Sequence, residues 1–334
     1  MKIALLLAVV LGASTAGTAA TPATAAAAAP APTVAPPAEP PIETVEVVGE
    51  RPGPSLWRVS KGDHVVWLLG TLDPLPKRMT WRSRQVESVI SQAQEVLESG
   101  PNVSARVGPI AAIKLYMQWR RTEKIPEKSQ LSSWLEPQLY ARFSALKQRY
   151  DAHDKRIEEL RPIFAARRLY EHTLDATKLT SHNDIQEAVL DLARKHHVAI
   201  VSTSLKLEDP KGVLTEVGEI PRAVEINCLE ATVQLLETDI TAMQARANAW
   251  AVGDVDALRK LPYPRVREVC IAAAATSPRI KALIDQAARD WNTALESALA
   301  RNRSTLALKQ IYDLIGPDGT LAQLRARGYV VEGP

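Results

Sequence analysis

The sequence predicts an α/β fold: a single domain with a central mixed sheet, formed by an N-terminal hairpin and C-terminal strands, and with a large helical middle. Strand-like apolar runs lie near both ends of the chain, and each one leads to an aspartate followed by Gly or Pro turn residues, at Asp73-Pro74 and at Asp313. Between these runs, apolar residues recur at helical spacing. Strands at both ends around a helical middle favour the α/β class.

The chain divides into three segments by composition. Residues 1–20 resemble a secretory signal peptide, because one charge, Lys2, precedes an apolar run and then a stretch of small residues. Residues 21–54 are rich in Ala, Pro and Thr and form the expected linker, with a short alternating strand at 42–48. The folded domain is expected over residues 55–334. An uncleaved membrane anchor is the alternative for the first segment, although its apolar run is shorter than a bilayer span requires.

Within the first half of the domain, the runs at 56–59 and 65–69 predict a hairpin around Gly62. Thr80 is the expected cap of a helix, and a short apolar run at Val96-Leu97 follows it. Residues 109–179 are expected to be mostly helical, with Ile110, Ile113 and Met117 on one stripe.

The second half begins with a helix capped by Asp184 and a buried strand at 198–202. One long helix is expected from Ile226 to Trp250, ending at Gly253, because its apolar residues alternate in steps of three and four. Ser277-Pro278 starts another helix, and a strand, a Gly-Pro turn, a helix at 320–327 and a strand at 329–331 close the chain. Apolar stripes of this kind are expected to pack in the core.

Composition and cysteine content limit the function classes. The net charge is +3 with 24% charged residues, and no basic run is interleaved with aromatics, so nucleic acid is not an expected partner. No later stretch is long and apolar enough to span a membrane. Cys228 and Cys270 are the two cysteines, and an even number in an exported chain favours a disulfide between them over two buried thiols.

The common catalytic motifs are absent from the sequence. The six histidines include no pair at the i, i+4 spacing of a helical metal site, and neither the Gly-x-Ser-x-Gly elbow nor a phosphate-binding loop occurs. His196 and His197 are adjacent, so their side chains point in different directions.

Two blocks of the chain resemble the TraB/GumN family, which is related to the Tiki peptidases. The opening block is Leu56-Trp57-Arg58-Val59 followed by Leu68-Leu69-Gly70-Thr71-Leu72, and the closing block is Leu314-Ile315-Gly316-Pro317-Asp318-Gly319 with Gly328-Tyr329. Between the blocks, residues 184–203 resemble the family's helix and strand before its Leu-Glu-Thr motif. The resemblance covers residues 56–332 in the same order.

The sequence departs from the family pattern at the positions that the relatives use for metal-dependent proteolysis. The family's Gly-Thr-Ile-His becomes Gly70-Thr71-Leu72-Asp73, and its closing Gly-Ala-Gly-His becomes Gln310-Ile311-Tyr312-Asp313. The first acidic position aligns with Ser99, or with Glu98 after a shift of one residue, and the Glu of Leu-Glu-Thr aligns with Ser202. Each Asp is either a turn cap or a remnant ligand. As ligands, Asp73, Asp313 and Glu98 would suit Mn, Mg or Ca better than zinc.

These departures predict an exported family member with a degenerate metal site, acting in the periplasm by binding or as a scaffold for an envelope partner, without catalysis and with no assigned cofactor. One alternative is a metal-dependent hydrolase or peptidase that uses Asp73 and Asp313 as ligands, with Glu98 as ligand or base. A second alternative, an accessory factor for cell-surface polysaccharide, is implied only by one namesake of the family.

Overall fold

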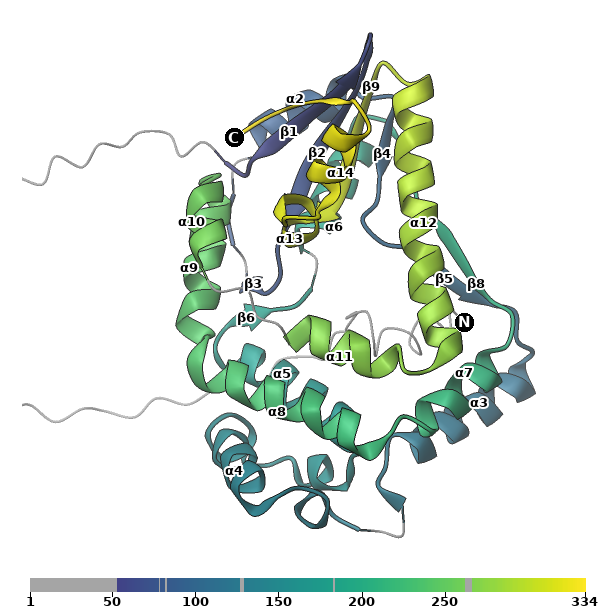
Figure 1. The fold of residues 1–334 in the computed structure, drawn as a ribbon, viewed down its shortest axis with the longest axis vertical. Coiled ribbons are helices and arrows are strands. Elements are labelled where there is room, and N and C mark those ends of the chain that lie inside the picture. Colours follow the sequence, from purple (N-terminus) through teal and green to yellow (C-terminus); the bar gives the residue numbers. More distant parts are fainter. Residues whose placement is uncertain (1–52, 78, 82, 127–128, 183, 262–265) are drawn as a thin grey trace, which may run out of the picture.

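A computed structural model describes residues 53–334, apart from residues 78, 82, 127–128, 183 and 262–265. The expected signal segment, most of the linker and the strand expected at 42–48 lie outside the described residues. The described chain combines a mixed six-stranded sheet with many helices, which confirms the predicted α/β class (Figure 1).

The six-stranded sheet joins the two ends of the domain, with strand order β10-β1-β2-β9-β4-β7. Its strands are β1 (Leu56–Lys61), β2 (His64–Thr71), β4 (Glu95–Leu97), β7 (Ala199–Val201), β9 (Ser304–Gln310) and β10 (Val330–Glu332). β1 and β2 form the predicted antiparallel hairpin, and β10 pairs antiparallel with β1. β2, β9, β4 and β7 run parallel to one another, so the ends of four strands meet at one edge of the sheet.

Two further pairs of short strands lie outside this sheet. β3 (Leu75–Pro76) pairs antiparallel with β6 (Leu179–Thr180), and β5 (Asn102–Ala105) pairs parallel with β8 (Ser204–Leu207). Sequence reasoning did not anticipate either pair, because strands of two to four residues are too short for an alternating pattern to emerge.

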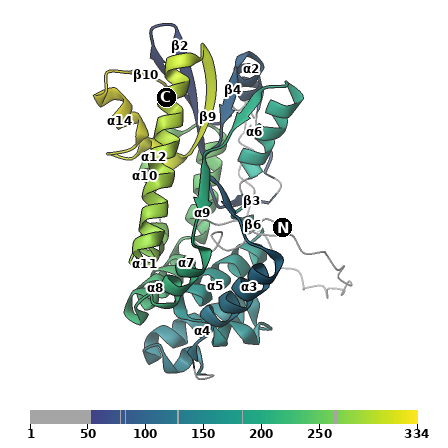
Figure 2. The same cartoon turned by 90° about the vertical axis from the view of Figure 1, so that its right-hand side faces the viewer.

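The helices form two groups, one around the sheet and one in a separate helical layer. Those that pack around the sheet are α2 (Arg84–Gln92), α6 (Asp184–Lys195), α9 (Ile240–Ala251), α10 (Val255–Lys260), α12 (Pro278–Arg301), α13 (Ile311–Ile315) and α14 (Thr320–Ala326). The helical layer contains α3 (Pro109–Thr122), α4 (Pro137–Asp151), α5 (Pro162–Ala176), α7 (Pro210–Gly218), α8 (Arg222–Thr238), α11 (Val266–Ala274) and the 3-10 turns at Leu131–Ser133 and Lys155–Glu159. Figure 2 shows α12 and α14 on one side of the sheet and α2 and α6 on the other.

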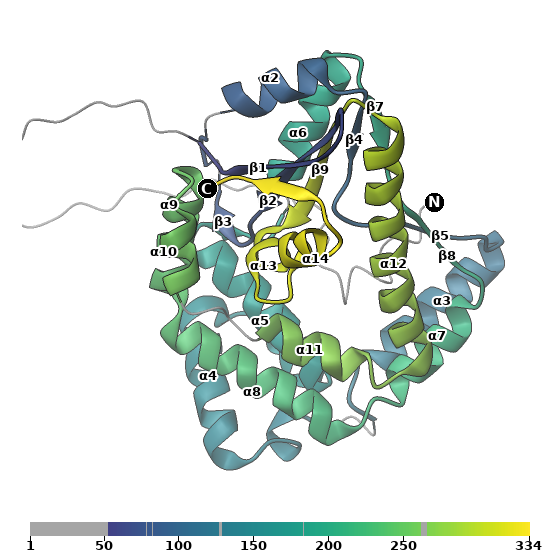
Figure 3. The same ribbon diagram turned by 45° about the horizontal axis from the view of Figure 1, so that its top comes forward.

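Each group has its own apolar core. The sheet core is formed by buried residues such as Leu68, Leu69 and Leu306, against which Trp250 and Trp291 pack from the helices. The second core lies among the helices and includes Phe143, Leu169 and Leu229. Figure 3 shows the helical layer below the sheet, with α9 and α12 extending between the two.

The long helix expected from Ile226 to Trp250 is in fact two helices. α8 ends at Thr238 and α9 begins at Ile240, because Asp239 has a non-helical backbone (φ −116°, ψ 0°). The carboxylate of Asp239 is buried in an ion pair with Arg246, which lies about two turns into α9. The apolar spacing continues across the break, so the pattern alone could not reveal it. The expected end of α9 at Gly253 is confirmed, with a left-handed φ of 73°.

Three smaller expectations are corrected by the structure. The first helix after the hairpin begins at Arg84 with Ser83 at its N-cap, not at Thr80. The strand-like run that leads to Asp313 ends at Gln310, where the short helix α13 begins. The stripe of Ile110, Ile113 and Met117 on α3 is exposed and does not pack in either core.

The expected cysteine pair is compatible with a disulfide. The sulfur atoms of Cys228, on α8, and Cys270, on α11, lie at bonding distance, and their Cα atoms are 4.8 Å apart. The bond would join two helices of the helical layer next to Leu229 and Ala273. No helix in the described part of the chain is long and apolar enough to cross a membrane.

Candidate functional site

The strand ends that carry the predicted site residues share one edge of the sheet. In the parallel register, Thr71 of β2 lies opposite Gln310 of β9, and Leu97 of β4 pairs with both Ala307 and Val201. The chain therefore reaches Asp73, Asp313, Glu98 and Ser202 just after it leaves the same edge. In parallel α/β sheets this carboxyl edge is where binding sites are commonly built.

Asp73 follows β2, and its side chain is exposed. It faces the helical layer, because its charge acts on Tyr170 of α5. Burial raises the pKa of the Tyr170 phenol well above its usual range, and the negative charges of Asp73 and Asp239 raise it further, against the opposing effect of Arg246. Asp239 and Arg246, whose charges also act on Tyr170, form a buried ion pair with each other.

Asp313 lies in the first turn of α13 and is half-buried. The side-chain oxygen Oε1 of Gln310 accepts a hydrogen bond of 2.8 Å from the backbone N–H of Tyr312, which caps the start of this helix. Asp313 therefore projects from a helical turn, whereas Asp73 follows an extended strand and directly precedes Pro74.

The side chain of Ile311 fills the space between the ends of β2 and β9. A Cβ added at Gly70 would lie only 2.3 Å from Cδ1 of Ile311, so the isoleucine packs directly on the glycine backbone. Trp250 closes the same place from α9, since its indole Nε1 donates a 2.6 Å hydrogen bond to the carbonyl oxygen of Gly70. Ile311 and Trp250 are both almost fully buried. This part of the edge is apolar and packed.

Glu98 and Ser99 follow β4 and are half-buried. The backbone carbonyl of Glu98 accepts a 2.9 Å hydrogen bond from Nε1 of Trp291, and the hydroxyl of Ser99 donates to Oε1 of Gln186 at 2.6 Å. Nζ of Lys309 lies 4.3 Å from the centre of the Trp291 ring. The backbone of Glu98 is therefore held by an indole that also carries a nearby cation, and these contacts stabilise the end of β4 whether or not a ligand binds there.

The structure brings together a different group of potential metal ligands. Within the described residues, Asp151, Asp154 and His172 are the group of three whose ligand atoms all lie within 4.8 Å of one another. Asp73, Asp313 and Glu98 do not form such a group, and a role for them as ligands stays a prediction. Sequence reasoning missed the new group because Asp151 ends α4, Asp154 caps the 3-10 turn that follows and His172 lies on α5, and no local motif joins them.

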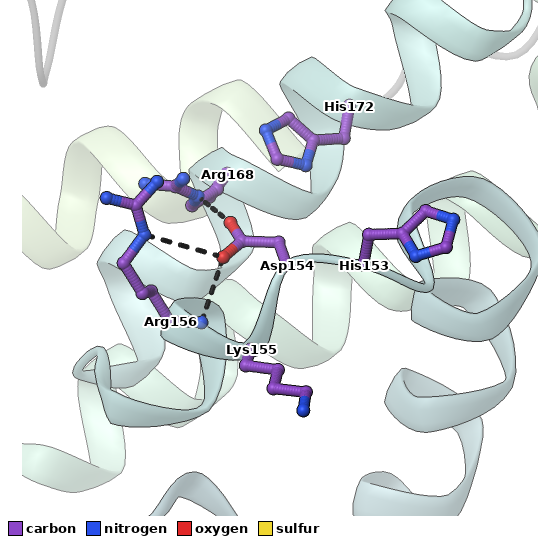
Figure 4. A pocket seen from close by; sticks show the side chains of 6 residues that line it. All are labelled: His153, Asp154, Lys155, Arg156, Arg168 and His172. Atoms are coloured by element: carbon purple, nitrogen blue, oxygen red, sulfur yellow. Dashed lines mark hydrogen bonds and ion pairs between the residues drawn. The ribbon is translucent and has the colours of Figure 1, made fainter.

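The surroundings of Asp154 already satisfy its carboxylate. Oδ1 accepts a 2.9 Å hydrogen bond from the backbone N–H of Arg156, and Oδ2 accepts one from Nε of Arg168 (Figure 4). Burial raises the pKa of Asp154, but the hydrogen bond from the Arg156 backbone and the charge of Arg168 outweigh burial and leave the pKa below its usual value. Oδ2 of Asp151 is hydrogen-bonded too, to Nδ1 of His172.

A pocket of about 400 Å³ opens beside this group, and its lining is mostly cationic. Figure 4 shows Arg156 and Arg168 on the same side of the Asp154 carboxylate, with Lys155 and His153 turned away from it. Carboxylate and imidazole donors suit a divalent cation, but the Asp154 oxygens here accept hydrogen bonds from the Arg156 backbone and the Arg168 guanidinium, and the Arg156 guanidinium lies 3.9 Å from Oδ1. The local charge therefore favours a structural ion-pair network over a cation site.

Comparison with known protein families identifies the family of this chain. The model of the TraB/PrgY/gumN family matches residues 55–333, which is nearly the whole described chain. The chain is therefore a member of the TraB/PrgY/gumN family. No curated protein and no solved structure matches it.

Proposed function

We propose that this family member acts by binding, in a periplasmic scaffold or recognition role, and not as a metal-dependent hydrolase at the strand-end edge. The observation that carries the proposal is the packing of Ile311 on Gly70, since it fills the space between the ends of β2 and β9 with an apolar side chain two residues before Asp313. A hydrolytic metal needs an open coordination position for water and substrate.

The separation of the three carboxylates supports the same proposal. Asp73 is associated with Tyr170 of the helical layer, Asp313 belongs to a helical turn, and Glu98 lies beyond β9 next to Trp291. A hard divalent ion needs several oxygen ligands at about 2.0–2.6 Å, and the proposal expects that these three positions do not supply them together. The hydrolase alternative retains one argument, which is that all three residues follow the same edge of the sheet.

Export to the periplasm rests on the sequence and on the cysteine pair. Lys2 and the apolar run after it have the pattern of a secretory signal, and the Cys228–Cys270 geometry suits an oxidising compartment. Mass analysis of protein recovered from a periplasmic fraction should give a chain that begins near Thr21. A chain that retains Met1 in the membrane fraction would contradict export with cleavage.

A peptidase assay with added metal tests the proposal. We expect wild-type protein supplied with Mn²⁺ or Co²⁺ to hydrolyse a mixed peptide substrate no faster than the double variant Asp73→Asn/Asp313→Asn. Asp318→Asn is the matched control, because Asp318 is an exposed carboxylate in the turn after α13. Metal-dependent turnover that persists in Asp318→Asn and disappears in the double variant would establish the hydrolase instead.

A further inference from the structure

Helix α3 carries most of the exposed large apolar side chains in the described part of the chain. Ile110, Ile113, Tyr116 and Met117 are 71%, 63%, 57% and 48% exposed, and outside α3 only Val330 belongs with them. Ile110, Ile113 and Met117 follow one another at steps of three and four residues, so they form one stripe along the helix. A contiguous exposed stripe of this kind marks an interaction surface.

The opposite face holds α3 firmly to the helical layer. Leu115 is buried, and the Trp119 ring packs edge-on against Phe164 with 5.2 Å between the ring centres. Nε2 of Gln118 donates a 3.2 Å hydrogen bond to the hydroxyl of Thr215 on α7. Figures 1 and 2 both place α3 beside α7 at the outer edge of this layer. The apolar stripe therefore faces outward on a fixed helix.

Basic side chains accompany the exposed stripe, and acidic ones are absent. Residues 99–122 contain four Arg or Lys residues and no Asp or Glu. Arg120 pairs with Glu123 at 2.6 Å, but Lys114 and Arg121 form no ion pair within the described residues. Arg121 lies one helical turn after Met117, so the apolar stripe leads directly to an unpaired guanidinium.

A basic pocket of about 330 Å³ lies at this end of α3. Arg121 and Lys124 line it together with Arg161, Arg222 and Trp134, and no carboxylate belongs to its lining. Glu225 fixes Arg161 by a buried ion pair. The guanidinium of Arg222 lies 4.6 Å from the centre of the Trp134 ring and donates a 2.6 Å hydrogen bond to its carbonyl oxygen. Because Lys124 pairs with Glu159 and Arg161 pairs with Glu225, the net positive charge beside this indole comes from Arg121 and Arg222.

We propose that α3 docks this protein onto an anionic phospholipid surface, with its apolar stripe among the acyl chains and a headgroup phosphate in the basic pocket. A helix with apolar and aromatic residues, interspersed with Lys and Arg, has the composition of an interfacial helix. Arg binds phosphate through paired N–H donors. A second copy of the chain is a poorer occupant, since a two-fold contact would bring Lys114 and Arg121 together with no acidic residue on α3 to pair with them.

Co-sedimentation with vesicles of defined composition tests the proposal. We expect the full-length protein without its signal segment to bind vesicles of phosphatidylcholine mixed with phosphatidylglycerol, and to bind pure phosphatidylcholine vesicles much more weakly. Lys114→Gln/Arg121→Gln should lower the partition coefficient roughly twenty-fivefold, from about fivefold for each basic residue at an anionic surface. Ile110→Ser/Ile113→Ser should lower it by roughly thirtyfold or more, because both side chains are largely exposed and would lose their contact with the acyl chains.

Arg325→Gln/Val330→Ser serves as the matched control, because both residues are exposed and lie on α14 and β10, away from α3 (Figure 1). The control should bind like the wild type. Three results would overturn the proposal: equal binding to neutral and anionic vesicles, equal binding by all the variants, or a concentration-dependent dimer that the α3 substitutions dissociate without any vesicle binding. The proposal does not depend on the state of the strand-end edge, so the peptidase assay and the vesicle assay can fail separately.

Discussion

At the scale of single residues, the contact between Gly70 and Ile311 decides what the strand-end edge can accommodate. The sequence indicated that residues larger than the family's small ones flank Asp313, and therefore that the space beside it is reduced. It could not indicate that Ile311 reaches across to β2, because that contact depends on β2 and β9 being neighbours in a parallel pair. The side chain then lies over the backbone of Gly70.

Substitutions at these two positions should be coupled. Gly70→Ala places a Cβ 2.3 Å from Cδ1 of Ile311, and overpacking of this kind costs roughly 1–3 kcal/mol. Ile311→Val removes that Cδ1 atom, so Gly70→Ala should cost less in the Ile311→Val background. Urea denaturation of the two single variants and the double variant measures the coupling. Gly100→Ala is the control, because nothing lies within 4 Å of its added Cβ. Strict additivity of the two costs would contradict the contact.

The buried pair of Arg161 and Glu225 gives a second residue-scale prediction, concerning pH. The Glu225 side chain is fully buried, and burial raises its pKa from 4.5 to about 7, although the charge and hydrogen bonds of Arg161 act in the opposite direction. Folded protein therefore holds this proton more tightly than unfolded protein. The resulting stability is fully present below about pH 4.5 and is lost as the pH rises through about 7.

The free energy of unfolding should accordingly fall for the wild type, relative to Glu225→Gln, between pH 5 and pH 7. Chemical denaturation of both proteins across this range measures the difference. Glu237→Gln is the control, because Glu237 pairs with Arg142 at the surface of the same helix. A difference between the wild type and Glu225→Gln that stays constant with pH would show that the pKa of Glu225 is not raised in the folded protein.

At the scale of elements, apolar periodicity predicted where helices lie better than where they end or what covers them. The period from Ile226 to Trp250 continues through the break at Asp239, because α8 and α9 both bury residues at that spacing. The stripe on α3 has the same kind of period, yet it is exposed. Spacing defines a common face of a helix, but only the tertiary arrangement determines what packs against that face.

The link between α8 and α11 is the element-scale feature that is easiest to test. Alkylation under denaturing conditions without reductant should modify neither Cys228 nor Cys270. Their sequence separation of 42 corresponds to about 4 kcal/mol of stabilisation in the chain-entropy model. Cys228→Ala/Cys270→Ala should therefore lower the free energy of unfolding by up to that amount in urea denaturation. Labelling of both thiols in the untreated protein would show that no disulfide forms.

At the scale of the whole molecule, the sequence was sufficient to predict that strands from the two ends of the chain form one sheet. The runs before Asp73 and Asp313 are adjacent parallel strands, as expected for ends that build one sheet. The group of Asp151, Asp154 and His172 could not be predicted, because it forms only when the end of α4 packs beside α5. Short strands such as β5 and β8 also depend on long-range pairing that no local pattern contains.

The candidate ligands at the strand-end edge and the group of Asp151, Asp154 and His172 can be substituted separately. Metal binding by such variants is the most direct test of a non-catalytic edge. The measurement is the stoichiometry of Mn²⁺, Zn²⁺ and Ca²⁺ bound after equilibrium dialysis, for the wild type, Asp73→Asn/Asp313→Asn and Asp151→Asn/Asp154→Asn. We predict that the first double variant binds each ion as the wild type does, with little change in stability. One equivalent of metal bound by the wild type and by Asp151→Asn/Asp154→Asn, but lost in Asp73→Asn/Asp313→Asn, would contradict a degenerate edge and identify it as a metal site.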